Sequence, residues 1–188
     1  MEHLIALFNS VYPLTNQDIN LLRERLFIQT IDKNTIHSYN GKICKKLSFV
    51  KSGIFKVVKT DEKGNSYIPY FITSGHFAVD IDSFSNKTNS EEDIISLIPS
   101  EIITITNIDY DYFEKEIFSF SKIISILKER ALLEKMKFKS EMLIDDATTK
   151  YKKLRQRQPE IIQQVSQNEI ALHLGISQYT LSRIKSKK

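Results

Sequence analysis

The side chains best suited to recognition chemistry lie near the C-terminal end of the sequence. Four of them would share one face of a helix: Gln178, Tyr179, Ser182 and Arg183. Glutamine and arginine can form paired hydrogen bonds with the edges of nucleic-acid bases, and hydroxyl groups suit bases and phosphates alike. These residue types at this spacing predict a helix whose outer face contacts DNA bases, with Arg183 as the main contact.

The segment around these side chains has the pattern of two helices joined by a tight turn. Residues 165–187 read VSQNEIALHLGISQYTLSRIKSK. Ser166 followed by Glu169 is a capping-box pattern, which marks the start of a first helix. Gly175 then supplies the left-handed conformation that commonly ends a helix. The pattern predicts a first helix that stops at this glycine.

A second helix is predicted immediately after the turn. Ser177 is suited to cap it, and Leu181 and Ile184 would point towards the first helix. We interpret the pair as a helix-turn-helix whose second helix, residues 177–187, enters the major groove of double-stranded DNA. Contacts with DNA phosphates are predicted at Ser166, Gln167, Thr180 and Lys185.

The distribution of charge favours a polyanionic partner. Residues 1–120 contain 12 Lys and Arg against 16 Asp and Glu, and residues 121–188 contain 15 against 7. The two parts therefore carry −4 and +8, which add up to the +4 of the whole chain. A basic module on an acidic body is typical of proteins that bind DNA. The alternative is a solvated, lysine-rich tail, and composition alone does not separate the two.

The first part of the chain has the pattern of a small β-structure. Glycines at positions 41, 53, 64 and 75 punctuate segments that are rich in β-branched and aromatic residues. Strands are expected at residues 46–51, 54–60, 67–72, 94–98 and 101–106. Pro69 indicates an edge position or a bulge in its strand. The spacing predicts an antiparallel barrel or sandwich, preceded by helical residues 4–27 with an N-cap at Thr15 or Asn16.

Helical spacing replaces the strand pattern after residue 108. Residues 109–142 contain neither Gly nor Pro. One apolar seam consists of Ile124, Leu127, Ala131 and Phe138, and another face carries Leu132, Met136 and Leu143. We predict a long helix that packs on its own barrel with one face and on a second subunit with the other, with the first seam as the dimer interface. The alternative is a core helix of a monomer. A further helix is expected at residues 145–157.

The order of these elements resembles the Crp/Fnr family of bacterial regulators, in particular its short Bacteroidetes-type members. The resemblance rests on Phe49-Val50-Lys51-Ser52-Gly53, on Gly75-His76-Phe77 and on the tail from Ile170 to Ile184. It implies an α+β fold with three parts: a jelly-roll, cyclic-nucleotide-binding-like barrel (1–108), a dimerisation helix (109–143) and a helix-turn-helix domain (144–188). It also implies a homodimer that binds two-fold symmetric promoter DNA, with RNA polymerase and a small-molecule effector as further partners to consider.

The effector site departs from the pattern of the relatives that bind cyclic AMP. Those relatives carry a Gly-Glu pair and an Arg-Ser pair, where this sequence has Val79-Asp80 and, at about the second place, Ser90-Glu91. No Arg occurs between positions 25 and 130, and three acids lie near the second place: Glu91, Glu92 and Asp93. Since a bound phosphate needs Arg, Lys or free N–H groups, we expect no response to cyclic AMP. The effector pocket stays unassigned.

Two other functions remain open. The basic tail could bind a protein, and salt-sensitive binding to duplex DNA would distinguish the two partners. An enzyme on a cupin-like barrel would need clustered metal ligands, whereas the four histidines, at positions 3, 37, 76 and 173, are scattered.

No catalytic residue, metal site or cofactor is therefore predicted. The single Cys44 excludes an internal disulfide and a cysteine-held iron–sulfur or zinc site. No apolar run approaches the ~20 residues that cross a bilayer. The N-terminus has no basic region before its short apolar stretch, so we expect a cytoplasmic protein without a signal peptide.

Overall fold

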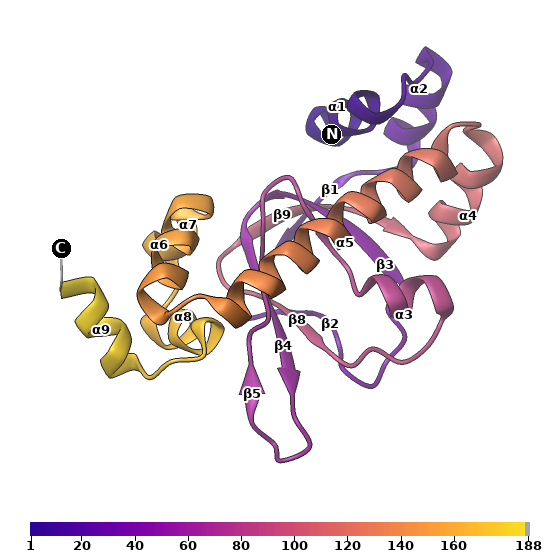
Figure 1. Ribbon diagram of the computed structural model, residues 1–188. Helices are drawn as coiled ribbons and strands as arrows, with labels where there is room; N and C mark the ends of the chain where they lie inside the picture. The colour runs from indigo at the N-terminus through magenta and orange to yellow at the C-terminus, as the bar shows by residue number, and fades with distance from the viewer. Residues whose placement is uncertain (187–188) are drawn as a thin grey trace.

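The computed structural model describes residues 1–186, which form N-terminal helices, a β-barrel, a long helix and a C-terminal helical unit (Figure 1). The helices are α1 (Glu2–Val11), α2 (Asn16–Arg25), α3 (Ile81–Asn86), α4 (Asn107–Glu116), α5 (Phe120–Ile144), α6 (Ala147–Arg157), α7 (Pro159–Gln164), α8 (Gln167–Leu174) and α9 (Gln178–Ser186). No helix within residues 1–186 is both long and apolar enough to span a membrane.

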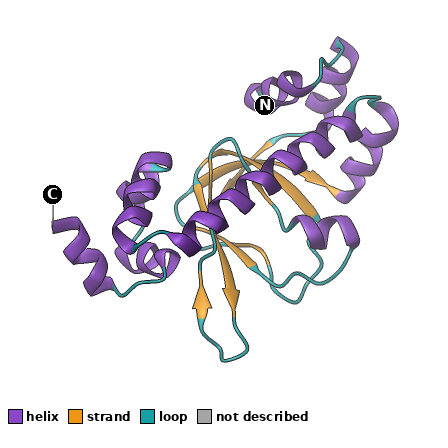
Figure 2. Cartoon of the chain, viewed as in Figure 1, coloured by secondary structure: helices purple, strands orange, loops and turns teal. Residues whose placement is uncertain are grey.

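The strands gather in the middle of the molecule, with helices at both ends (Figure 2). They are β1 (Ile28–Ile31), β2 (Ile36–Ser38), β3 (Lys46–Ser52), β4 (Ile54–Thr60), β5 (Ser66–Tyr67), β6 (Phe71–Thr73), β7 (Phe77–Ala78), β8 (Asp93–Ser96) and β9 (Ser100–Thr106). One sheet has the order β1-β9-β3-β7, and the other has the order β2-β8-β4-β5 with β6 beside β4.

All the strand pairs are antiparallel, and the two sheets enclose an apolar core. Phe49 of β3 lies opposite Ile103 of β9, and Phe55 of β4 lies opposite Ser96 of β8. Side chains of both sheets fill the interior: Val50, Phe55, Val57, Ile72, Ile94 and Ile102. The predicted antiparallel barrel and the α+β fold class are confirmed.

Several short elements differ from the prediction. The strand expected at residues 67–72 is two strands, β5 and β6, which pair with different parts of β4. Pro69 lies between them, and because proline has no N–H to donate, the chain leaves the sheet at this point. β1, β2 and β7 contain four, three and two residues, which is too short to show a clear alternation in the sequence.

The single helix predicted over residues 109–142 is wrong, because α4 ends at Glu116 and α5 begins at Phe120. Between the two helices the chain turns sharply, and Phe118 is 98% exposed there. The rings of Phe113 and Phe120 meet in the core with centroids 5.5 Å apart. Burial of these two rings favours the turn, which periodicity cannot reveal because apolar residues continue through it.

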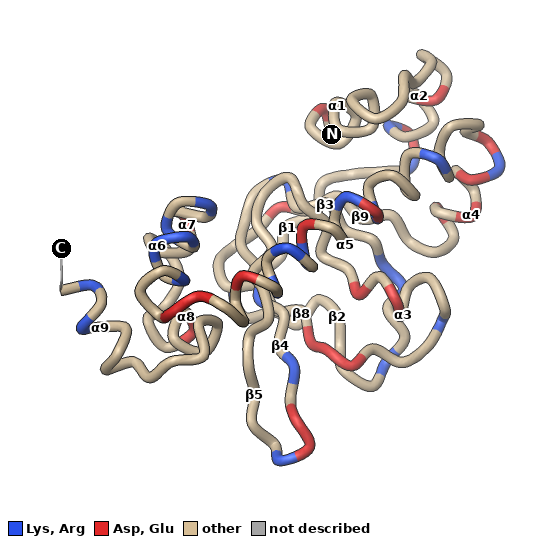
Figure 3. The backbone as a smooth tube through the Cα atoms, viewed as in Figure 1, with Lys and Arg blue, Asp and Glu red and all other residues tan. Residues whose placement is uncertain are grey.

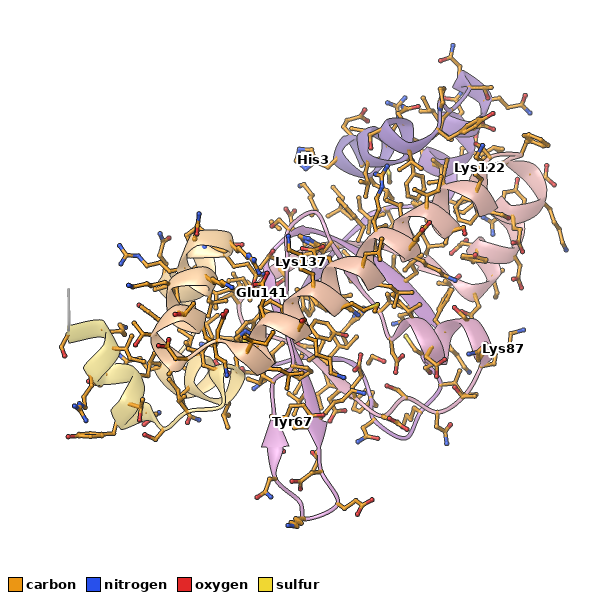
Figure 4. All side chains as sticks on the ribbon, viewed as in Figure 1. His3, Tyr67, Lys87, Lys122, Lys137 and Glu141 are labelled. Atoms are coloured by element: carbon orange, nitrogen blue, oxygen red, sulfur yellow. The ribbon has the colours of Figure 1, made fainter. Side chains whose placement is uncertain are left out.

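The start of α5 is anchored beside the N-terminal helices. Buried side chains of this shared core include Leu4, Phe8, Leu22, Ile123 and Ile124. Lys122 lies over the ring of Tyr12 at 4.8 Å and ties α5 to the end of α1 (Figure 4). Thr15 is the N-cap of α2, and its Oγ1 accepts a hydrogen bond from Asp18 N at 3.1 Å.

The C-terminal helical unit, α6 to α9, packs directly on the barrel. One apolar core combines Ile54, Ile68, Phe71 and Leu97 of the barrel with Tyr151, Leu154, Ile161, Ile170, Leu174 and Leu181 of the helices. Lys56 Nζ of β4 also pairs with Glu169 Oε1 of α8 at 2.9 Å. The barrel and the helical unit therefore form one packed body.

His173 of α8 lies in this contact and is only 5% exposed. Its ring centroid lies 4.8 Å from that of Phe71 on the barrel and 5.4 Å from that of Phe138 on α5, on which it stacks. Nδ1 is 2.9 Å from the carbonyl oxygen of Ile68, to which a neutral ring can donate. Burial lowers the pKa of His173 to about 4, although the bond to Ile68 opposes this shift. His173 therefore packs as a neutral side chain at neutral pH.

Gly53 occupies the point where the chain passes from one sheet to the other. Its φ is +131°, and a Cβ there would lie 2.1 Å from Ser100 Oγ and 3.0 Å from Ser100 Cα. We expect Gly53→Ala to lower the free energy of unfolding by ~3 kcal/mol or more, because overpacking and backbone strain add. Gly64→Ala, at a hairpin tip with open space around it, should cost only ~1–2 kcal/mol. Urea denaturation compares the two, and equal losses would contradict the steric argument.

Neutral, buried His173 should make the free energy of unfolding rise with pH between about 4 and 6.5. In this window the unfolded chain binds a proton at this position and the folded chain does not. His173→Gln keeps a hydrogen-bond donor and should reduce the slope by up to ~1.4 kcal/mol per pH unit. Urea denaturation at a series of pH values measures the slope. Leu172→Gln, at the exposed neighbouring position, is the control, and an unchanged slope in His173→Gln would refute the assignment.

Candidate nucleic-acid interface

The start of α8 is exposed and capped by Ser166. Ser166 Oγ accepts a hydrogen bond from Glu169 N at 3.3 Å. The predicted capping box is only half formed, because the Glu169 carboxylate accepts from Ser166 Oγ at 2.9 Å and pairs with Lys56 rather than with the backbone of the cap. The N–H groups of the first helical turn have no partner within the helix. The Ser166 hydroxyl is engaged by Glu169, so this end of α8 offers a phosphate the N–H groups of its first turn other than that of Glu169.

A glycine turn connects α8 to α9, as the sequence predicts. Gly175 ends α8 with a φ of +66°. Ser177 caps α9, since its Oγ accepts a hydrogen bond from Thr180 N at 3.1 Å. Leu181 is fully buried against α8 and the barrel core. The helix-turn-helix is confirmed over the described residues, and the predicted end of its second helix at Lys187 lies outside them.

The side chains predicted to contact bases lie on the exposed surface of α9. Gln178, Tyr179, Ser182 and Arg183 are all exposed. The guanidinium of Arg183 lies over the ring of Tyr179 at 5.8 Å, so the two side chains support each other at the surface. Figure 1 shows α9 at the outer edge of the helical unit. The structure therefore brings the predicted residues together on one accessible helix.

The residues predicted to contact phosphates differ in their exposure to solvent. Ser166 and Gln167 are exposed at the start of α8, and Lys185 is half-buried near the end of α9. Thr180 is also half-buried, and its Oγ1 lies 2.9 Å from Ser177 Oγ. Its hydroxyl is thus already engaged in the cap of α9, as the Ser166 hydroxyl is with Glu169, which leaves Gln167 and Lys185 as the members whose side-chain donors are not used in a cap.

Ion pairs with α5 neutralise part of the basic charge on α6. Lys153 Nζ lies 2.7 Å from Asp145 Oδ2, and Arg157 Nη1 lies 2.7 Å from Glu141 Oε2. Hydrogen bonding to Arg157 lowers the pKa of the Glu141 carboxyl (Figure 4). Basic side chains of the unit outside these pairs are Lys150, Lys152, Arg155, Arg183 and Lys185. Figure 3 shows this positive charge along α6 and α9.

Two grooves border the helix-turn-helix. One of about 180 Å³ is lined by Thr180, Arg183 and Ile184 of α9 and by Ala147 and Thr148 at the start of α6. The other, of about 440 Å³, lies where the barrel meets the end of α7 and the start of α8, with Lys33, Gln164 and Ser166 in its lining. Neither groove was predicted from the sequence, because each joins segments that are far apart in the chain.

The apolar seam predicted as the dimer interface faces its own chain, and this prediction is corrected. Ile124 is 3% exposed and lies in the core with the N-terminal helices. Leu127 packs partly against the same core, and Phe138 stacks on His173. Ala131, between them, is half-buried. The seam is the intramolecular side of α5, so it is not free to hold a second subunit.

The opposite side of α5 is apolar and exposed. Its side chains are Leu132 (49% exposed), Leu133 (58%), Met136 (67%), Leu143 (79%) and Ile144 (81%). We call them the outer face of α5. Figure 1 shows α5 running along one side of the barrel towards the helical unit. A contiguous exposed apolar surface is typical of an interaction site.

Comparison with known proteins identifies the fold. No protein-family sequence model matches the chain, and no curated protein matches it by sequence. A structure described as a transcriptional regulator of the Crp/Fnr family from Eubacterium rectale matches with a TM-score of 0.71 at 18% identity, covering 95% of this chain and 83% of that one. The c-di-GMP-responsive global regulator CLP from Xanthomonas campestris matches with a TM-score of 0.69 at 17% identity, covering 92% and 91%.

A third match covers a similar share of the chain. The catabolite activator protein from Thermus thermophilus has a TM-score of 0.57 at 16% identity, covering 96% of this chain and 85% of that one. The three alignments cover 92–96% of this chain. At such identities the likeness concerns architecture. The chain has the fold of the Crp/Fnr regulators.

Proposed function

We propose that this protein is a DNA-binding transcription regulator of the Crp/Fnr type. The observation that carries the proposal is the exposed surface of α9, where Gln178, Tyr179, Ser182 and Arg183 stand on the second helix of a helix-turn-helix. The unpaired basic side chains around it supply the charge that attracts a polyanion. The matched structures support the proposal, because one is a transcriptional regulator of the Crp/Fnr family and another is a global regulator of virulence gene expression.

The proposed mode of binding places α9 in the major groove. Arg183 donates two hydrogen bonds to O6 and N7 of one guanine, while Gln178, Tyr179 and Ser182 contact neighbouring bases. Ser166 and Gln167 at the start of α8, together with Lys185, contact phosphates and set the docking angle. In a homodimer, two copies of α9 meet half-sites about 34 Å apart, one helical turn, on a two-fold symmetric site.

The alternative functions have less support. A protein partner would use the same basic surface, and binding that weakens as salt rises on duplex DNA would decide against it. A cupin-like enzyme would need histidines that reach a common metal. His173 instead packs between Phe71 and Phe138, and His37 lies against Phe55 with ring centroids 5.9 Å apart. These two rings serve packing, and we propose that the protein is not an enzyme.

We also propose that the barrel does not respond to cyclic AMP. Asp80 caps α3 by accepting hydrogen bonds from Asp82 N and Ser83 N, each at 3.1 Å. Ser90 Oγ donates to Asp80 Oδ2 at 2.7 Å. The side chains at the two positions where cyclic-nucleotide binders hold their ligand thus engage each other. RNA polymerase is the further partner through which such a regulator would act.

The homodimer is proposed to form through the outer face of α5. This face contains Leu132, Leu133 and Met136, whose spacing of three to four residues is that of a helix–helix seam. Leu143 and Ile144 continue the exposed apolar surface towards the helical unit. Burying such side chains between two copies contributes about 1.5–3 kcal/mol for each fully covered side chain. The same helix would then join the two DNA-binding units of the dimer.

Substitutions in α9 should separate base reading from phosphate binding. Arg183→Ala should weaken binding to a selected two-fold symmetric site by ~1–3 kcal/mol and relax the preference at one base pair per half-site. Lys185→Ala should weaken specific and non-specific DNA alike and reduce the salt dependence by about one unit per subunit. Fluorescence anisotropy at several salt concentrations measures both effects. Lys63→Ala, at the tip of the β4–β5 hairpin, is the control. Unchanged affinity and base preference in Arg183→Ala would exclude α9 as the reading helix.

A charge on the outer face of α5 should separate the subunits. Met136→Glu places a carboxylate in the proposed interface, so light scattering should give about 21.9 kDa instead of about twice that mass. Arg130→Glu, at an exposed position outside the outer face, should remain dimeric. Leu127→Glu should lower the free energy of unfolding, because Leu127 packs against the core of its own chain. A Met136→Glu variant that stays dimeric would contradict the interface.

A further inference from the structure

A buried polar cluster joins the barrel to α5. We call Lys59, Tyr70, Glu92 and Lys135 the barrel–helix cluster. Glu92 is only 6% exposed, and its Oε1 accepts a hydrogen bond from Tyr70 OH at 3.0 Å. Lys135 Nζ of α5 donates to the same Tyr70 oxygen at 2.9 Å and lies over the tyrosine ring at 4.2 Å. Lys59 Nζ of β4 lies 3.6 Å from Glu92 Oε2. The Glu92 carboxylate thus contacts one ammonium group and a phenol directly, and the second ammonium group, that of Lys135, reaches it through the Tyr70 oxygen.

The burial of this carboxylate is unfavourable by itself. Desolvation raises the pKa of Glu92, and the nearby Asp80 carboxylate raises it further, whereas Lys59, Lys135 and Tyr70 lower it. Burial likewise lowers the pKa of Lys135, which Glu92 opposes. The buried charges of Glu92 and Lys135 therefore stabilise each other. Removing either side chain leaves the other as an uncompensated buried charge.

The cluster contacts α5 beyond the buried first turns of the helix. The buried residues of α5 are Phe120, Ile123 and Ile124, all within its first turns. Further along, Lys135 reaches into the barrel, and Phe138 then stacks on His173 of the helical unit. Glu134 also faces His76, but this pair is exposed and 3.9 Å apart, which makes it weak. The cluster is thus one of several contacts that position the middle of α5, together with the hydrogen bond from Lys128 Nζ to Ser85 Oγ at 2.9 Å and the stacking of Phe138.

We propose that Glu92 is a built-in anionic ligand of the barrel, which holds α5 in its DNA-binding position so that no small-molecule effector is needed. Its carboxylate fills the space between Lys59, Tyr70 and Lys135, which a small carboxylate or another compact anion would otherwise suit. That this position of α5 is the one that binds DNA rests on the proposed function. The link between Glu92 and the position of α5 is a separate, measurable property of the chain.

Chemical rescue tests the proposal in the full-length protein. Glu92→Ala removes the side chain beyond Cβ, and acetate replaces the lost methylene and carboxylate. Hydrogen–deuterium exchange in the second half of α5 should become at least about tenfold faster in the variant, as expected from breaking a buried charge cluster. Potassium acetate should restore slow exchange, whereas potassium chloride of equal ionic strength should not. DNA affinity should fall and recover in parallel, and acetate should change neither property of the wild type.

Matched variants show whether the effect belongs to the cluster. Glu62→Ala, at an exposed position of the β4–β5 hairpin tip, is the control for the carboxylate, because Glu91 itself lies 3.8 Å from Lys59. Lys135→Met should speed exchange in α5 without acetate rescue, and Lys137→Met, at an exposed position of the same helix, should not. If Glu92→Ala does not fold, the comparison of Lys135→Met with Lys137→Met decides whether the cluster holds α5.

Two results would overturn the proposal. The first is exchange in α5 that remains as slow in Glu92→Ala and Lys135→Met as in the wild type. The second is a wild type whose α5 slows its exchange when cyclic AMP or another anion is added, because the site would then await an external ligand. If exchange in α5 follows the expectation while no variant or wild type binds DNA, the inference about the barrel stands and the proposed function fails.

Discussion

The apolar contact between the barrel and the helical unit determines how the rest of the molecule is presented. Leu181 of α9 shares one core with Ile68 and Phe71 of the barrel. Because the buried side of α9 is fixed there, the polar side of this helix has to face solvent. A helix-turn-helix on a free linker would sample many directions, whereas this one has a single direction relative to the barrel. The orientation of α9 relative to the barrel is thus set by apolar packing. The neutral ring of His173 is part of that packing.

The long helix α5 connects this contact to the N-terminal end of the molecule through three chemically different attachments. Its first turns are held by apolar burial, its middle by a buried charge cluster and its end by ion pairs from Glu141 and Asp145 to α6. A helix of 25 residues spans ~38 Å. Within residues 1–186, these attachments leave the outer face of α5 exposed. The proposed homodimer would form on this side.

The sequence predicts features whose determinants are local. The ends of α8 and α9 are marked within a few residues by Ser166, Gly175 and Ser177. The strands β3, β4 and β9 are each seven residues long, which is enough to show a strand pattern in the sequence. The inner side of α5 was assigned wrongly from the sequence, because both of its faces are apolar and the choice depends on distant partners such as His173. The barrel–helix cluster was also beyond prediction, since its four members come from four separate segments. Local patterns thus yield the elements, including the helix-turn-helix, but not the contacts between them.

The Glu169 carboxylate contacts both the start of α8 and the barrel. Glu169 accepts a hydrogen bond from the hydroxyl of the α8 cap and is also the partner of Lys56 on the barrel. A phosphate that approaches the start of α8 would repel this carboxylate, and any movement of Glu169 alters its pairing with the barrel strand β4. By thermodynamic reciprocity, a phosphate at the start of α8 and the Lys56–Glu169 pair would each change the equilibrium constant of the other by the same factor. If α8 contacts DNA as proposed, the state of this ion pair on β4 would therefore depend on DNA binding.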